Sequence, residues 1–233
     1  MNRGLTTIAL VLASCRAEVA PPPAAIAQLD DSAAPPVRER PAVDADWDAE
    51  PEAAAWTELT GRAIDEVGGA LIAAEPRDVA QFCPGYASLD ADGRRAFWIG
   101  LISAMARLES GFDPSVAFDE RAHCSDPGCE DDFTTQDGRA VVSRGLLQLS
   151  QESANAYRNC SVPPERELDL HEPGLNLRCA VVILARWVEG DGQIGASERP
   201  YRGGARYWSV LRRPANLEAI RRFTASTSIC SAS

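Results

Sequence analysis

The stretch Ala104-Met-Ala-Arg-Leu-Glu-Ser-Gly-Phe-Asp-Pro114 places a carboxylate on the apolar side of a predicted helix. Met105, Ile102 and Trp98 precede Glu109 at helical spacing. Side chains at this spacing share one face of a helix, so Glu109 belongs to a stripe that faces the protein interior. Because glutamates are rarely found on such a stripe, the position marks Glu109 as a candidate functional residue.

The predicted helix also ends close to Glu109. Gly111 suits the position just after a helix, and Pro114 is a stop signal beyond it. Glu109 therefore falls in the last turn, where the helix dipole disfavours an anion. Burial and helix position both predict a raised pKa, as a general acid requires. The structural alternative is a buried glutamate paired with an arginine such as Arg107.

The rest of the chain shows mainly helical periodicity. Apolar spacing predicts helices at about residues 56–74, 94–110, 145–157, 176–188, 204–211 and 215–223. Between residues 118 and 142 lies a polar loop insertion. Because no segment alternates convincingly as a strand does, we expect an all-α domain.

Composition limits the possible functions. The chain has 233 residues, of which 45% are hydrophobic, which is enough for one globular domain with extensions. Its formal net charge of −11 disfavours nucleic acid as a partner. Arginines outnumber acidic residues from Asn176 onwards, and this basic stretch is either a solvated face or a surface for an anionic ligand.

The N-terminus resembles a bacterial lipoprotein signal. A short positive start and an apolar run at 4–12 lead directly into Leu12-Ala-Ser-Cys15. This pattern predicts a signal peptide at 1–14 and a lipid anchor on Cys15, facing the periplasm, with the outer membrane favoured by Arg16. Residues 15–51 are rich in Ala, Pro and acidic residues and are expected to form a disordered tether to a domain at 52–233.

The cysteine count fits an exported protein. With Cys15 lipidated, six cysteines remain for disulfides: Cys83, Cys124, Cys129, Cys160, Cys179 and Cys230. Cys124 and Cys129 flank the turn sequence Ser-Asp-Pro-Gly, so we expect them to pair. Elimination and proximity favour Cys160 with Cys179 and Cys83 with Cys230, but no local feature decides between these and other pairings.

A metal site is the alternative use of some of these cysteines. Zinc could be bound by His123, Cys124, Cys129 and His171. Their spacing matches no common zinc pattern, and export favours disulfides. We therefore expect neither a metal nor a cofactor.

Four motifs, in order, resemble those of the soluble lytic transglycosylases. They are Glu109-Ser-Gly-Phe-Asp-Pro114, Gly145-Leu-Leu-Gln148, Asn176 before an apolar helix, and Tyr207-Trp208. The resemblance covers about residues 82–215 and implies a lysozyme-like helical fold. The last motif departs from the family pattern, since Ala205-Arg-Tyr-Trp-Ser209 replaces the usual Ala-Tyr-Asn-Ala-Gly.

The resemblance also implies a reaction and its residues. Glu109 would be the single acid and base that cleaves the β-1,4 bond between N-acetylmuramic acid and N-acetylglucosamine in peptidoglycan glycan strands, leaving a 1,6-anhydro ring. Gln148, Tyr207 and Ser110 would contact the glycan. The serine that usually follows the proline is missing, and Ser143 is the candidate substitute.

Two other functions remain open at this level. A hydrolase of goose-lysozyme type would need a second carboxylate to hold water, which Asp113, Asp119 or Glu130-Asp-Asp132 could supply. A glycan-binding scaffold lipoprotein without activity would explain the altered Tyr207 motif but not the retained Glu109.

Overall fold

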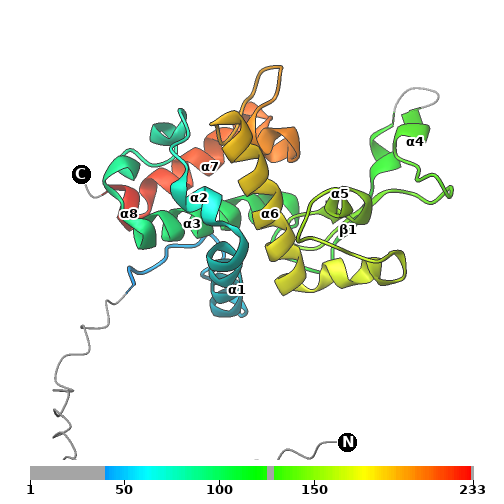
Figure 1. The fold of residues 1–233 in the computed structure, drawn as a ribbon, viewed down its shortest axis with the longest axis horizontal. Coiled ribbons are helices and arrows are strands. Elements are labelled where there is room, and N and C mark those ends of the chain that lie inside the picture. The colour runs from blue at the N-terminus through cyan, green and yellow to red at the C-terminus, as the bar shows by residue number, and fades with distance from the viewer. Residues whose placement is uncertain (1–39, 125–128, 232–233) are drawn as a thin grey trace, which may run out of the picture. The chain divides into compact units, whose positions relative to one another are not determined.

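The computed structural model describes residues 40–124 and 129–231, which form a mainly helical domain (Figure 1). The predicted signal peptide, Cys15 and the tether as far as residue 39 lie outside the described residues. The helices are α1 (Ala53–Val67), α2 (Gly69–Ala73), α3 (Ala91–Glu109), α4 (Cys129–Asp132), α5 (Gln151–Asn155), α6 (Pro173–Asp191), α7 (Pro214–Ser226) and α8 (Ser228–Ser231). Single turns of 3-10 helix connect them: η1 (Val79–Gln81), η2 (Tyr86–Ser88), η3 (Glu120–His123), η5 (Gly203–Arg206) and η6 (Ser209–Leu211), with the longer η4 (Pro164–His171).

A small antiparallel sheet corrects the all-α expectation. Strand β1 (Ala117–Asp119) pairs with β2 (Val142–Arg144), which in turn pairs with β3 (Leu149–Ser150). The central strand places Ser143 between Phe118 and Ser150. Strands of two or three residues are too short to show the alternation by which strands are recognised in a sequence.

The predicted helix at 145–157 is wrong over its first half. Gly145 has a φ of +74°, and the chain turns there before forming β3, so only α5 is helical. Leu146, Leu147 and Leu149 are all fully buried. Their burial produces an apolar run that resembles one face of a helix, although the residues lie in a turn and a strand.

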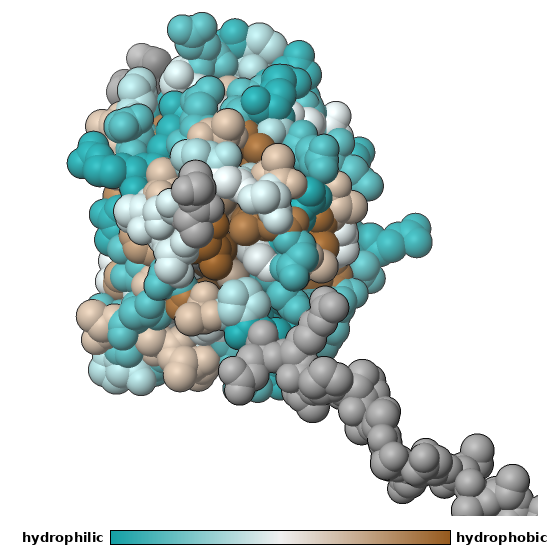
Figure 2. All heavy atoms as spheres, turned by 90° about the vertical axis from the view of Figure 1, so that its left-hand side faces the viewer, coloured by the Kyte–Doolittle hydropathy of each residue, from teal (hydrophilic) through white to brown (hydrophobic). Residues whose placement is uncertain are grey.

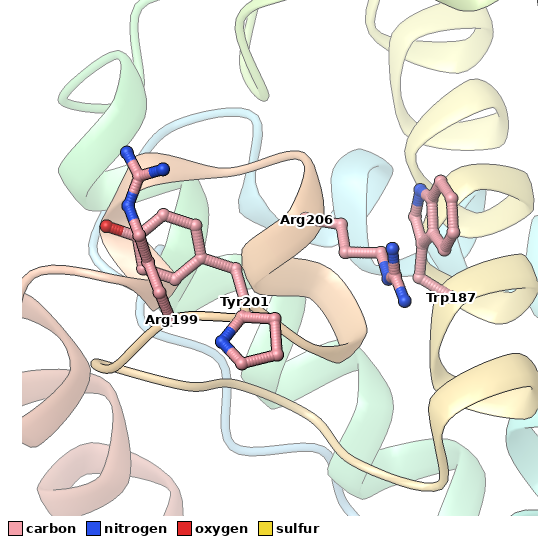
Figure 3. Close-up of a pocket in the computed structure, with 5 residues that line it drawn as sticks. Trp187, Arg199, Tyr201 and Arg206 are labelled. Atoms are coloured by element: carbon pink, nitrogen blue, oxygen red, sulfur yellow. The ribbon is translucent and has the colours of Figure 1, made fainter.

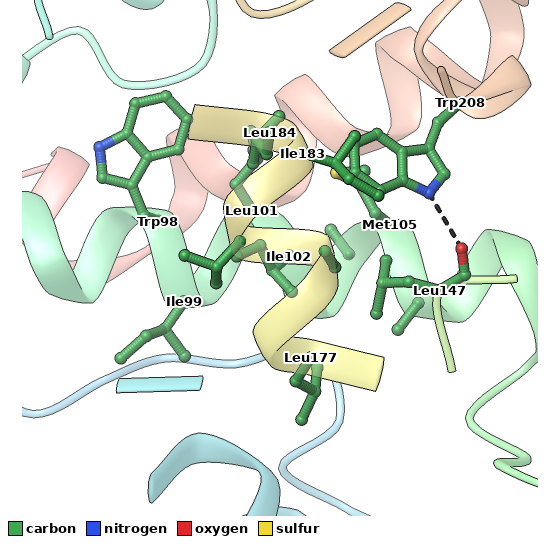
Figure 4. Close-up of a cluster of buried hydrophobic side chains, with 14 of the residues drawn as sticks. Trp98, Ile99, Leu101, Ile102, Met105, Leu147, Leu177, Ile183, Leu184 and Trp208 are labelled. Carbon is green, nitrogen blue, oxygen red and sulfur yellow. Dashed lines mark hydrogen bonds between the residues drawn. The ribbon is translucent and has the colours of Figure 1, made fainter. Parts of the chain in front are cut away.

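Buried side chains of α3 and α6 lie together in one cluster of the core (Figure 4). Trp98, Ile102 and Met105 of α3 are 0–1% exposed, which confirms the apolar stripe expected below Glu109. Leu177 and Leu184 of α6 are fully buried in the same cluster. Asp90 caps α3 by accepting a hydrogen bond from the Gly93 N–H (2.9 Å).

The predicted helix at 56–74 is divided into α1 and α2 at Gly68. A Cβ on Gly68 would lie 2.8 Å from the Ile64 Cα and 2.9 Å from a methyl group of Val181, so the close approach of α1 and α6 requires glycine. Helix α6 continues past Gly190 and ends at Gly192, whose φ of +59° is the left-handed conformation of a helix terminus.

Packed structure begins before residue 52, inside the stretch that the sequence assigns to the tether. Trp47 is fully buried and Ala45 is 5% exposed. The Trp47 indole donates a hydrogen bond to Thr57 Oγ1 (2.9 Å), and Asp46 accepts one from Arg107 Nε (2.5 Å). Burial of Trp47 and these two hydrogen bonds hold this otherwise polar segment against the core.

The described cysteines form three disulfides. Cys124 bonds to Cys129, as the turn sequence predicts, and the pairs Cys160–Cys179 and Cys83–Cys230 are those favoured by elimination. Because the Cys124 and Cys129 sulfurs are bonded to each other, the zinc alternative loses two of its ligands. Three disulfides are typical of proteins in oxidising, extracytoplasmic compartments.

One side of the domain surface is seen in Figure 2. The side of the domain that carries α8 is largely hydrophilic, with a small group of apolar atoms near its centre (Figure 2). Of the helices in residues 40–124 and 129–231, none combines the length and the apolar character needed to cross a membrane.

Candidate functional site

A cleft of about 880 Å³ lies at the C-terminal end of α3. Glu109 is the last residue of α3. Strand β2 contributes Ser143, and η3 contributes Glu120. The segment that contains η5 and η6 contributes Tyr207 and Arg212. Segments far apart in the sequence therefore meet around one carboxylate.

Glu109 has the electrostatic properties that the sequence predicts. Its Oε1 is buried and has no hydrogen-bond partner. Burial raises the pKa of Glu109 to about 7, against the opposing effect of the Val210 backbone. The nearby charge of Glu120 raises this pKa further, while Arg213 and Arg212 lower it. The carboxyl group can thus exist in both protonation states near neutral pH.

The structural alternative for Glu109 is not observed. Arg107, which could have paired with it, instead forms an ion pair with Asp46, with Nε and Oδ2 2.5 Å apart. Within residues 40–124 and 129–231, no ion pair involves Glu109. A largely buried carboxylate without an ion-pair partner is costly, which makes it a strong candidate for a functional group.

The Gly145-Leu-Leu-Gln148 motif is a turn that Asn176 holds in place. The Asn176 amide donates to the backbone carbonyls of Arg144 and Leu170, and its oxygen accepts from the Leu147 N–H, each at 2.9 Å. Asn176 is fully buried at the start of α6. Its role is therefore to join the turn to the core, and it is not exposed to a ligand.

Gln148 lines the cleft, as expected, and is held rigidly. Its φ of +47° lies in the left-handed region. Its Nε2 donates to the backbone carbonyls of Val116 (3.2 Å) and Gly145 (2.8 Å). With both amide hydrogens used in this way, Gln148 can offer a ligand only its carbonyl oxygen.

Tyr207 and Trp208 have different roles. Tyr207 lines the cleft, and burial raises the pKa of its hydroxyl to about 12, while Ser153 and the Ser150 backbone act in the opposite direction. The hydroxyl is therefore a neutral hydrogen-bonding group. Trp208 is 2% exposed and donates through its indole to the Leu147 carbonyl (2.9 Å; Figure 4). Trp208 thereby packs the Tyr207-Trp208 motif against the Gly145-Leu-Leu-Gln148 motif.

Glu120 is a cleft residue that the sequence analysis missed. It is half-buried, and Ser143 donates a hydrogen bond to its carboxylate through Oγ. His123 Nε2 lies 3.8 Å from its other oxygen. Nothing local separates Glu120 from the many acidic residues around it. Only the pairing of β1 with β2, which brings Ser143 beside it, identifies it.

Other sequence candidates divide between the cleft and its surroundings. Ser143 and Asp132 line the cleft. Ser110 does not line the cleft; it is the C-cap of α3, and its Oγ donates to the Ala106 carbonyl (3.2 Å). Asp113 accepts hydrogen bonds from Ser115, and Asp119 is paired with Arg121. Neither aspartate lines the cleft.

These features together define a disulfide-bonded, mainly helical protein with a protonatable glutamate in its cleft, an arrangement typical of acid–base enzymes. No family model and no curated protein matches the chain. Solved structures of Bd0314 DslA are similar to it. The wild-type form is 38% identical, with a TM-score of 0.70, and the match covers 81% of this chain and 98% of that one. The chain belongs to the same family as DslA.

Variants of DslA with a glutamate replaced by glutamine have also been solved. Two such variants, with different glutamates replaced, are each 37% identical to this chain, with TM-scores of 0.70 and 0.71. Each match again covers 81% of this chain and 98% of the other.

Proposed function

We propose that this protein cleaves the β-1,4 bond between N-acetylmuramic acid and N-acetylglucosamine in peptidoglycan, with Glu109 as the proton donor. The observation that carries the proposal is the buried, unpartnered Oε1 of Glu109 in an open cleft, with a pKa of about 7. Departure of a sugar oxygen needs a proton, and a carboxyl group of this pKa supplies it efficiently at neutral pH.

In this proposal the cleft binds the glycan and Glu109 is the general acid. The protonated carboxyl donates its proton to the glycosidic oxygen as the bond to the sugar carbon breaks. The Gln148 oxygen and the Tyr207 hydroxyl would orient the sugar. Because both side chains are already held by hydrogen bonds, little freedom is lost when the substrate binds.

The position of Glu120 favours water as the group that attacks the sugar. Inverting glycosidases place a second carboxylate across the scissile bond to activate water. Glu120 lines the same cleft as Glu109, and Ser143 fixes its carboxylate. The two glutamates replaced in the DslA variants are eleven positions apart, as are Glu109 and Glu120. We therefore favour a lysozyme-like hydrolase.

The motif order favours a second route on the same site. In a lytic transglycosylase, the Glu109 carboxylate would take the proton from the sugar's own 6-hydroxyl, and an anhydro ring would form without water. This route needs a single carboxylate and leaves Glu120 without a chemical role. The resemblance of Glu109-Ser-Gly-Phe-Asp-Pro114 and Gly145-Leu-Leu-Gln148 to that family supports it.

Mass spectrometry of products separates the routes. Purified peptidoglycan is incubated with the full chain and with the Glu109→Gln variant, and the released muropeptides are weighed. We expect reducing ends from the wild type and no release by the variant. Anhydro ends would identify the transglycosylase route. Absence of release by both proteins, with glycan binding retained, would instead support the scaffold function.

The proposal also includes location. A lipid on Cys15 and a tether before residue 40 would hold the domain near the outer membrane, facing the periplasmic glycan. Labelling of the intact protein with a lipid precursor, with Cys15→Ala as the control, tests this part independently of activity.

A further inference from the structure

A second hollow lies beside the cleft and is not used by the proposed chemistry. It has a volume of about 640 Å³ and is lined by Trp187, Arg199, Pro200, Tyr201 and Arg206. Figure 3 shows Arg199 with Tyr201 on one side and Arg206 with Trp187 on the other. Arg206 lines both this hollow and the cleft that contains Glu109, so the two adjoin at this side chain.

Two guanidinium groups lie against the Tyr201 ring, that of Arg199 from the lining of the hollow and that of Arg212 from the lining of the cleft. The Arg199 guanidinium carbon lies 5.4 Å from the centre of the Tyr201 ring, and that of Arg212 lies 5.0 Å from it. Burial lowers the pKa of Arg212, and the nearby Arg199 charge lowers it further. Arg212 donates hydrogen bonds to the backbone carbonyls of Ala205, Arg206 and Tyr207, whereas in the part of the chain that the structure describes Arg199 has no carboxylate within ion-pair distance.

The other arginine of the hollow is already neutralised. Arg206 pairs with Asp191 through two hydrogen bonds, of 2.7 and 3.0 Å, and its guanidinium lies 4.8 Å from the centre of the Trp187 ring. Among the residues that line the hollow, Arg199 therefore carries the positive charge that no carboxylate neutralises. An anion bound at Arg199 would also reduce its repulsion with the nearby Arg212.

We propose that this hollow binds the carboxylate-bearing peptide that is attached to the glycan strand, which would make peptide-bearing strands better substrates than peptide-free ones. The inference rests on the proposed function. Trp187, Pro200 and Tyr201 offer apolar surface to small peptide side chains, and Arg199 offers a fork of donors to a carboxylate. A long polyanion fits poorly, because the net charge of the chain is −11.

Binding can be measured without turnover. Calorimetry with the full-length Glu109→Gln variant uses a muramyl dipeptide with a free carboxylate as the probe. Adding Arg199→Ala is expected to weaken its affinity at least fivefold. Adding Arg62→Ala instead, at an exposed arginine of α1, should leave the affinity unchanged. The proposal would be overturned if the amidated dipeptide bound as tightly as the dipeptide with a free carboxylate. It would also be overturned if inorganic phosphate bound as tightly as that dipeptide and displaced it.

Turnover gives a second measurement. The kcat/KM of each protein is compared on glycan of one length with and without its peptides. We expect the ratio of the two values to fall about fivefold in Arg199→Ala and to stay at the wild-type value in Arg62→Ala. An unchanged ratio in Arg199→Ala overturns the peptide site. Loss of wild-type cleavage on both glycans, with carboxylate-dependent dipeptide binding intact, overturns only the proposed function.

Discussion

The side-chain nitrogen of Asn176 lies 2.5 Å from the point where a Cβ on Gly145 would stand. The Leu170 carbonyl lies still closer to that point, at 2.2 Å. The first residue of the Gly-Leu-Leu-Gln motif is therefore glycine because a buried asparagine and a carbonyl fill its side-chain space. The motif and Asn176, which are separate in the sequence, form a single structural unit.

Asn176→Ala should destabilise the domain strongly. The change leaves the Leu147 N–H and two buried carbonyls without partners, so we expect a loss of about 3 kcal/mol in the free energy of unfolding. Urea denaturation measures it. Asn216→Ala on α7, outside this network, should change the free energy by less than about 0.5 kcal/mol. Equal losses of unfolding free energy in the two variants would show that the three Asn176 hydrogen bonds do not stabilise the domain more than an ordinary surface residue does.

Glu109→Gln should abolish turnover and leave the fold intact. The amide has nearly the same size but cannot donate a proton to a leaving oxygen, so kcat should fall by at least about a thousandfold. Muropeptide release measures the rate, and circular dichroism checks the fold. The control is Glu58→Gln, at a glutamate whose side chain is 72% exposed on α1. Turnover that survives in Glu109→Gln would exclude Glu109 as the acid.

The raised pKa of Glu109 should also appear as a pH dependence of stability. This pKa is about 7 in the folded protein and 4.5 for an unperturbed glutamate of the unfolded chain, so the folded state binds the extra proton between these values. Protonation of Glu109 therefore contributes about 3 kcal/mol to the free energy of unfolding. This contribution is fully present below pH 4.5 and is lost as pH rises through 7. Glu109→Gln should remove the loss, and urea denaturation of both proteins at about pH 4.5 and about pH 8 tests this.

The pH dependence of kcat should also be set by protonation of Glu109. The acid form of Glu109 is required for bond cleavage, so kcat should decline as pH rises above 7. Glu120→Gln removes a neighbouring negative charge, which lowers the pKa of Glu109 and should move this decline to lower pH. A pH profile measured on soluble glycan checks both statements. A profile that Glu120→Gln leaves unmoved would contradict the coupling of the two carboxylates.

Glu120→Gln also tests the chemical route. If Glu120 activates water, kcat should fall about a hundredfold or more with little change in KM. Glu130→Gln, in the same acidic insertion but not in the cleft lining, is the matched control. A nearly unchanged kcat in Glu120→Gln, together with anhydro products, would favour the transglycosylase route.

Two disulfides should differ in their contribution to stability. The Cys83–Cys230 bond spans 147 residues and the Cys124–Cys129 bond spans five. In the chain-entropy account, their closure is worth about 5 and about 2 kcal/mol respectively. Replacing each pair by alanine and measuring urea denaturation should therefore give unequal losses. Equal losses would show that the entropy of the unfolded chain is not the controlling factor.

Local patterns predicted the long helices and the catalytic candidate, because both depend on neighbours in the sequence. The apolar stripe of α3 identified the position of Glu109, and the turn between Cys124 and Cys129 identified their bond. Glu120 could not be found in this way. Its place in the cleft depends on the pairing of β1 with a strand more than twenty residues further on.

The remaining differences have the same cause. The strands are too short to show a period, and the buried leucines of the Gly145 turn resemble a helix face. Trp47 stands alone in a polar stretch, and its place in the core is shown only by the folded chain, where it is fully buried and bonds to Thr57. The basic stretch after Asn176 shows no pattern that places Arg199 and Arg212 together, and only the fold brings both to the Tyr201 ring.

The Cys83–Cys230 bond has a consequence for the lifetime of the protein. Peptidases that reach an exposed loop can cut a chain without unfolding it. A single cut between Cys83 and Cys230 leaves two pieces that are still covalently joined, and Glu109 and Tyr207 both lie within that span. A nicked molecule therefore keeps every residue of its cleft on one covalent unit.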